Sequence, residues 1–149
     1  MSEIEIKNMT VEHMMEVVEM MRVFYASPAV LSNGSEEIFQ NNVENCVNDN
    51  PYLEGYVFAE KNKEEDILGY AMVAKSFSTE FGKTCMWIED LYLKPNCRGN
   101  GIGTQFFSFI EKKYPAALLR LEVEAENERA IHVYKKCGFK ELPYLEMKK

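Results

Sequence analysis

Three glycines at alternate positions form a turn with the composition of a phosphate-binding loop. Gly99, Gly101 and Gly103 lie between a stretch typical of a β-strand and a stretch typical of a helix. Glycine lets the backbone approach a ligand closely and adopt positive φ angles. The first N–H groups of a helix have no partner within the helix, so they bind anions. Arg98 adds a planar guanidinium group that suits phosphate oxygens. We therefore predict a phosphate ligand at this turn.

Two other phosphate-binding motifs do not fit the turn. A dinucleotide fingerprint needs a glycine at its sixth position, which is Thr104 when counted from Gly99 and Phe106 when counted from Gly101. A Walker loop ends in Gly-Lys followed by Ser or Thr, and Gly103-Thr104 lacks the lysine. On this turn alone, a glycine-rich loop that binds no ligand remains the alternative.

The spacing of apolar residues predicts the elements that hold this turn. Alternating apolar residues indicate strands, and apolar residues three and four apart indicate helices. Antiparallel strands followed by a β-helix-β crossover predict one α+β domain over residues 1–149. The predicted order begins with a strand around Ile4 and Ile6, helices from Thr10 to Ser27 and from Ser35 to Asn50, and strands at 56–59, 67–75 and 84–93. A charged turn at 61–66 separates the strands at 56–59 and 67–75. A helix from the glycine turn to Pro115, a strand at 118–123, a helix from Asn127 through Lys136, and one or two short strands within 139–147 follow.

The composition is that of an ordinary globular domain. Of the 149 residues, 46% are hydrophobic and 28% are charged, so the chain can bury a core without disulfides or a metal. No window approaches 18 uncharged apolar residues, and residues 1–7 lack the apolar core of a signal peptide. The four cysteines show no metal-ligand spacing with the two histidines. We expect a cytoplasmic protein with reduced cysteines, no metal and no membrane contact.

The charge is distributed unevenly along the chain. Residues 1–60 hold 11 acids and 2 bases, whereas residues 61–149 hold 13 acids and 15 bases. General nucleic-acid binding needs a basic surface, so this distribution disfavours it. It suits a protein that holds an anionic cofactor with one half and a cationic substrate with the other. A solvated acidic surface without such a role is the alternative.

Two motifs cover residues 87–104 and 121–139. The first is Arg98-x-x-Gly101-x-Gly103 preceded by Ile88-Glu89-Asp90-Leu91-Tyr92-Leu93-x-Pro95, and the second is Leu121-Glu122-Val123 followed by Asn127, Ala130, Tyr134, Lys136 and Gly138-Phe139. Both resemble motifs of the GNAT superfamily of acyl-CoA N-acetyltransferases, and the order of the predicted elements agrees with that family. The resemblance implies an α+β fold of the GNAT type, with a central mixed, mostly antiparallel sheet flanked by about four helices.

The resemblance implies acetyl-CoA as the co-substrate. Backbone amides of residues 98–104 would hold the pyrophosphate, and the strand edge at residues 91–93 would pair with the pantetheine arm. A backbone donor near Leu91 would polarise the thioester carbonyl. Asn127 would contact the pantetheine and cap its helix, and the cap alone is the alternative. The residues implied to bind the cofactor are Leu91, Tyr92, Leu93, Arg98, Gly99, Asn100, Gly101, Ile102, Gly103, Thr104, Asn127, Ala130, Tyr134 and Lys136.

Catalytic roles also follow from the resemblance. Tyr134 would protonate the departing CoA thiolate, and a buried aromatic residue without that role is the alternative. Ile88-Glu89-Asp90 is similar to the Leu-Glu-Asp of diamine acetyltransferases, where the Glu position acts as base through water. We predict Glu89 as the base, directly or through a water chain, and Asp90 as the partner of the amine's charge. On a regular strand the two side chains face opposite sides, and a β-bulge would change that.

These roles predict direct transfer of an acetyl group from acetyl-CoA to a primary amine. The acidic first 60 residues favour a small cationic acceptor. The resemblance implies that the first two helices wall the acceptor pocket, which Phe24, Tyr25 and the acids nearby would then line. A protein or peptide amine, a different acyl group, and a CoA-binding module without catalysis are the alternatives. Family members are often dimers, so the resemblance implies a homodimer.

Overall fold

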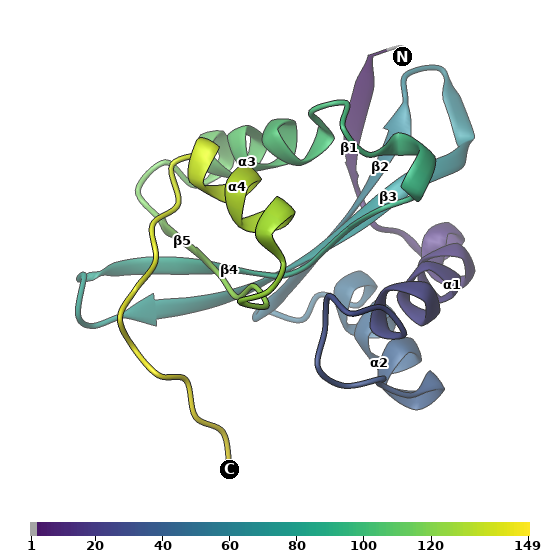
Figure 1. The fold of residues 1–149 in the computed structure, drawn as a ribbon. Helices are drawn as coiled ribbons and strands as arrows, with labels where there is room; N and C mark the ends of the chain where they lie inside the picture. Colours follow the sequence, from purple (N-terminus) through teal and green to yellow (C-terminus); the bar gives the residue numbers. More distant parts are fainter. Residues whose placement is uncertain (1–2) are drawn as a thin grey trace.

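A five-stranded sheet with the order β1-β2-β3-β4-β5 forms the centre of the computed structural model, which describes residues 3–149 (Figure 1). The first four strands pair antiparallel, and β5 pairs parallel to β4. The predicted mixed, mostly antiparallel sheet with four helices is confirmed. The elements are β1 (Ile4–Asn8), η1 (Val11–His13), α1 (Met14–Tyr25), α2 (Glu36–Val47), β2 (Leu53–Glu60), β3 (Lys63–Ser78), β4 (Lys83–Leu93), η2 (Pro95–Cys97), α3 (Ile102–Lys113), β5 (Leu118–Leu121) and α4 (Glu128–Lys136), where η marks a 3-10 turn.

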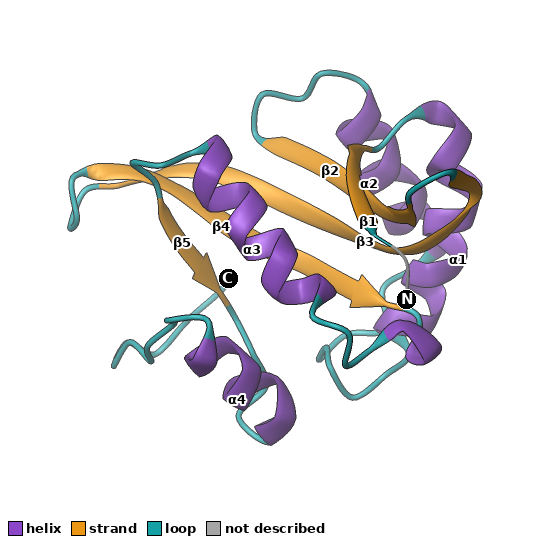
Figure 2. Cartoon of the chain, turned by 90° about the horizontal axis from the view of Figure 1, so that it is seen from above, coloured by secondary structure: helices purple, strands orange, loops and turns teal. Residues whose placement is uncertain are grey.

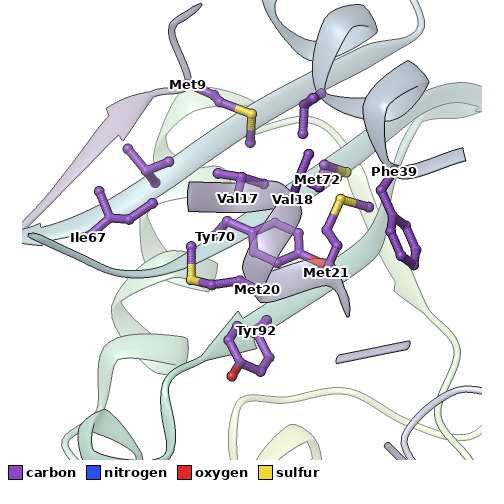
Figure 3. Close-up of a cluster of buried hydrophobic side chains, with 12 residues drawn as sticks. Met9, Val17, Val18, Met20, Met21, Phe39, Ile67, Tyr70, Met72 and Tyr92 are labelled. Carbon is purple, nitrogen blue, oxygen red and sulfur yellow. The ribbon is translucent and has the colours of Figure 1, made fainter. Parts of the chain in front are cut away.

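The helices cover both faces of the sheet. Figures 1 and 2 show α1 and α2 on one face and α3 on the other, with α4 beyond α3 on the side of β5. Because side chains alternate along a strand, each of the central strands contributes to both cores. The core beneath α1 and α2 contains Tyr70, whose ring is surrounded by Val17, Met21 and Met72 in Figure 3. The core beneath α3 contains Tyr56, Phe58, Ala71, Val73, Met86, Ile88, Ile102, Phe106, Phe107 and Ile110.

Side-chain caps begin two of the helices where the sequence predicts them. The Ile38 amide donates to Ser35 Oγ over 3.2 Å at the start of α2. The Ala130 amide donates to Asn127 Oδ1 over 3.2 Å at the start of α4. Such caps satisfy helix amides that have no partner inside the helix. Within residues 3–149, every helix is too short or too polar to cross a membrane.

A group of charged and phenolic side chains fixes the C-terminal end of α3 to the sheet. Glu54 of β2 accepts hydrogen bonds from Tyr56 over 2.6 Å and from Tyr114 over 2.5 Å. Lys75 Nζ of β3 lies 3.0 Å from the same carboxylate, and Lys113 donates to the Tyr56 hydroxyl over 2.7 Å. These partners lower the pKa of Glu54 despite its partial burial. The group joins three elements at the end of α3 opposite the glycine turn.

The structure corrects three of the predicted boundaries. Residues 139–147 form no strand in the described chain but an extended tail, which Tyr144 attaches to Glu80 through a 2.5 Å hydrogen bond. Pro143 lacks an N–H group for strand pairing. β5 ends at Leu121 instead of residue 123. The charged turn is shorter than predicted, because β3 begins at Lys63 and Asn62 takes a φ of 68° in a tight turn. The prediction that residues 1–7 lack a signal-peptide core includes residues 1–2, which lie outside the described residues.

Candidate active site

The sheet opens between β4 and β5. Their pairing ends at Ile88 and Leu121, whereas β4 continues to Leu93. The Lys94 amide donates to Leu68 of β3 over 2.9 Å, so the N–H and C=O groups of residues 92 and 90 also face β3. Those of Leu91 and Leu93 therefore face the gap, and the Leu93 carbonyl there accepts a 2.9 Å bond from Arg98. This edge can pair with an extended ligand.

The glycine turn prepares the start of α3 for an anion. Gly99 and Gly101 have φ angles of 81° and 76°, which L side chains adopt only with strain. Gly101 is the N-cap of α3 and offers no side chain, so within the described structure no cap group occupies the amides of the first turn. The first helical amide bond is that from Gln105 to Gly101, which leaves the amides of residues 102–104 available. An added Cβ on Gly101 would meet nothing within 4 Å, so the turn is open to a ligand.

Two guanidinium groups lie near this turn. Arg98 is exposed, and its guanidinium lies 5.6 Å from the centre of the Tyr92 ring. Arg129 of α4 brings Nη2 to 4.0 Å from the position that a Cβ on Gly99 would take. Arg129 is not part of the motifs described above. Its place two residues after the predicted cap Asn127 is the sequence signal that could have identified it.

A β-bulge separates Glu89 from Asp90. Met72 and Val73 of β3 pair with Asp90 and Ile88, so Glu89 is the extra residue. The bulge reverses the alternation of β4: Ile88 belongs to the core beneath α3, whereas Tyr92 belongs to the core beneath α1 and α2. Without it, residues 88, 90 and 92 would share one face.

Asp90 is buried and fully engaged by two tyrosines. Its side chain and backbone are only 4% exposed. Its Oδ1 accepts a 2.9 Å hydrogen bond from Tyr25 at the end of α1, and its Oδ2 accepts a 2.7 Å bond from Tyr70 of β3. Burial raises the pKa of Asp90, and the two phenol donors oppose that rise. Phe24, the other residue predicted to line the acceptor pocket, lies beside Tyr25, with their ring centres 5.4 Å apart.

Three glutamates meet where β4 and β5 separate. Partial burial of the Glu89 carboxyl raises its pKa, and the charges of Asp90 and Glu146 raise it further. Partial burial and a hydrogen bond to Glu146 raise the pKa of Glu122 to about 7. Glu122 follows β5 directly and Glu146 belongs to the C-terminal tail. Glu89, Glu122 and Glu146 thus form an acidic group at this separation, and mutual repulsion contributes to the raised pKa values of Glu89 and Glu122.

Tyr134 lies in the groove beside β5, which has a volume of about 1040 Å³ and is also lined by Glu122 and Glu146. Its ring packs edge-to-face against Phe107 and Phe139, with centroids 5.9 and 6.0 Å apart. Burial raises the pKa of its hydroxyl, so the hydroxyl stays protonated near neutral pH. Glu89 is not among the residues that line this groove, but it interacts electrostatically with Glu122 and Glu146, which do line it.

The other predicted residues take up distinct positions around the gap. Tyr92 is 5% exposed, and its backbone N–H and C=O groups face β3 instead of the gap. Asn100 donates to the Cys97 carbonyl over 3.2 Å and so shapes the turn. Ala130 is half-buried and Lys136 is exposed on α4. Among residues 3–149, no three His, Cys, Asp or Glu side chains come together as a metal-binding group.

Comparison with known proteins identifies similar sequences and folds. A family model described as the acetyltransferase (GNAT) family matches residues 17–139. A thialysine N-epsilon-acetyltransferase from Bos taurus is 37% identical over 86 residues, which cover 54% of this chain and 48% of that protein. The matched part therefore spans about half the length of this curated relative.

Solved structures extend the likeness to the whole fold. A structure described as a possible acetyltransferase from Clostridium difficile 630 has a TM-score of 0.80 at 18% identity, covering 98% of this chain and 96% of that one. An aminoglycoside N-acetyltransferase in complex with CoA has a TM-score of 0.80 at 12% identity, covering 100% and 95% of the two chains. At these identities the likeness concerns the fold.

Proposed function

Because this chain belongs to the GNAT acetyltransferase family, we propose that it transfers an acetyl group from acetyl-CoA to a primary amine of a small cationic acceptor. One observation carries the proposal: the edge of β4 that β5 leaves uncovered is followed, after η2 and the glycine turn, by a helix N-terminus without a side-chain cap. An extended pantetheine arm and its pyrophosphate have this same succession of a strand-like chain and an anion. The CoA complex of the aminoglycoside N-acetyltransferase with this fold supports the choice of cofactor.

The proposed donor site uses backbone groups for most of its contacts. The amides of Ile102, Gly103 and Thr104 bind the pyrophosphate, and Arg98 and Arg129 add positive charge on either side of the turn. Leu91 and Leu93 pair with the pantetheine through the groups that face the gap. The Leu91 N–H then donates to the thioester oxygen as negative charge develops there.

The proposed reaction is a direct attack of the amine on the thioester. Glu89 removes a proton from the amine, directly or through water, and its raised pKa strengthens it as a base. A nitrogen–carbon bond forms at the acetyl carbon, and the carbon–sulfur bond breaks. Tyr134 gives its proton to the departing sulfur, for which its protonated hydroxyl is suited.

The charge around Glu89 supports a cationic acceptor. Glu89, Glu122 and Glu146 interact electrostatically at one side of the gap. A second positive group on the acceptor would relieve their mutual repulsion. The bovine relative is named for thialysine, and the structural neighbour is an aminoglycoside N-acetyltransferase, so both names refer to amines.

An acceptor screen with a thiol readout tests this function. We expect saturable release of CoA thiol with at least one small diamine or amino sugar, and calorimetric binding of acetyl-CoA without an acceptor. Release with a lysine-containing peptide alone would favour a protein substrate, and faster release from a longer acyl-CoA would favour another donor. Binding without thiol release for any amine would favour a CoA-binding module, and absence of binding would refute the cofactor assignment.

Arg129 provides a specific prediction about the donor site. Arg129→Gln removes a charge beside the turn, so we expect the KM for acetyl-CoA to rise about fivefold, a loss of about 1 kcal/mol for an exposed ionic contact. The KM for the acceptor should stay unchanged. Lys112→Gln, an exposed residue near the other end of α3, is the control and should leave both constants unchanged. An equal effect of the two substitutions would show that only net charge matters.

A homodimer in the cytoplasm remains part of the proposal. The tail beside the groove exposes large apolar side chains, with Leu145 and Met147 88% and 85% exposed, and a second copy would cover such residues. Light scattering of the purified chain distinguishes a dimer from a monomer. Binding to nucleic acid is not expected.

A further inference from the structure

Asp90 is a buried carboxyl group, and each of its two oxygens accepts a hydrogen bond from a tyrosine. A carboxylate without partners is costly to bury, and here each oxygen accepts one phenol hydrogen bond. At 4% exposure it offers no free surface to an amine unless Tyr25 moves. We propose that Asp90 is a positioning residue that acts through Glu89 and Tyr25 instead of binding the acceptor itself. This inference rests on the proposed function.

The hydrogen bonds of Asp90 connect three elements around the bulge. Tyr25 is the last residue of α1, and Tyr70 lies in β3, the strand against which the bulge forms. Holding Asp90 in place fixes the backbone on which Glu89 is the extra residue, and it also fixes the Tyr25 hydroxyl, which interacts electrostatically with Glu89. The remaining titratable group that faces Asp90 is the Cys46 thiol of α2. Burial and the charge of Asp90 raise the pKa of this thiol to about 12, so it stays neutral.

The charge of Asp90 also acts on Glu89 directly. The groups that interact with Glu89 are Asp90 in β4, Tyr25 in α1, Glu122 after β5 and Glu146 in the tail. Asp90 is the charge in this set that the fold holds rigidly, since it is buried and bonded on both oxygens. A like charge beside a carboxylate raises its pKa and makes it a stronger base near neutral pH.

Asp90→Asn tests this coupling without depending on activity. We expect the pKa of Glu89 to fall by about 1 unit, because the substitution removes a like charge beside a partly solvated carboxyl group. Carbon-13 NMR of carboxyl-labelled glutamate measures it, with the signal assigned by Glu89→Gln. In kinetics, the acidic limb of the kcat/KM profile should move to lower pH by the same amount.

A pair of buried tyrosines provides the matched control. Tyr70 and Tyr56 are both 0% exposed, and both donate to a carboxylate, Asp90 and Glu54 respectively. Tyr70→Phe should lower kcat about tenfold and raise the pKa of Asp90, because it removes a hydrogen bond that lowers this pKa. Tyr56→Phe should lose a similar amount of stability yet keep kcat within about twofold.

Several outcomes would overturn the inference. One is an unchanged Glu89 titration in Asp90→Asn, and another is an equal kinetic effect of Tyr70→Phe and Tyr56→Phe. If Asp90→Asn does not fold, the carboxyl titration of Asp90 in Tyr70→Phe decides, and an unchanged pKa there contradicts the proposal. A wild-type protein that transfers no acetyl group refutes the proposed function, whereas the two NMR titrations still decide the role of Asp90.

Discussion

Tyr134→Phe should lower kcat for acetyl transfer about 100-fold, the contribution typical of a positioned general acid. The substitution removes only the hydroxyl. The ring that packs against Phe107 and Phe139 stays, so the groove keeps its shape. The dissociation constant of acetyl-CoA, measured by calorimetry, should therefore change by less than about twofold, since most contacts of the proposed donor site come from the glycine turn and β4.

Tyr144→Phe is the matched control for this prediction. Tyr144 lines the same groove, but its hydroxyl donates to Glu80 at the surface. We expect both kcat and acetyl-CoA binding to remain near wild type. Equal losses of kcat and affinity in Tyr134→Phe would assign Tyr134 to donor binding, and an unchanged kcat would remove the acid assignment. In the wild type, kcat should also fall at alkaline pH as the hydroxyl with its raised pKa loses its proton.

Gly69→Ala should cost about 3 kcal/mol of unfolding free energy, the upper range for overpacking in a core. A Cβ at this position would lie 2.1 Å from the carbonyl oxygen of Tyr92 and 3.1 Å from the Cα of Leu93. Both are backbone atoms of the neighbouring strand, so no side-chain rotation relieves the clash. The melting temperature, measured by circular dichroism, should fall by about 9 °C for a domain of this size.

Gly82→Ala separates this clash from a general effect of replacing glycine. Gly82 has a φ of +65° in the β3–β4 turn, and a Cβ there would meet nothing within 4 Å. Its cost is the left-handed strain alone, about 1 kcal/mol. Equal destabilisation by the two substitutions would contradict the predicted contact with β4.

Local sequence signals predicted the parts of the site that are made of backbone. The glycine turn could be found from sequence because positive φ angles at Gly99 and Gly101 and a strand-to-helix change leave their mark within a few residues. The caps at Ser35 and Asn127 were predictable for the same reason. The roles assigned to Glu89 and Tyr134 came from the resemblance and remain predictions.

Features that depend on distant residues were not predictable in this way. The bulge at Glu89 is a property of how β3 pairs with β4, so the sequence allowed it without requiring it. The burial of Asp90 depends on Tyr25 and Tyr70, which lie 65 and 20 positions away in the chain. The tail was predicted as strands from its apolar residues, yet it pairs with no strand in the described structure.

The extra residue in β4 has a consequence for changes in chain length. Deleting Glu89 would remove the candidate base and yet leave β3 and β4 regularly paired, because Ile88 and Asp90 already oppose the consecutive residues Val73 and Met72. Asp90 and Tyr92 would therefore keep facing the core beneath α1 and α2. A shortened strand of this kind should keep its fold and lose only the carboxylate that the bulge presents.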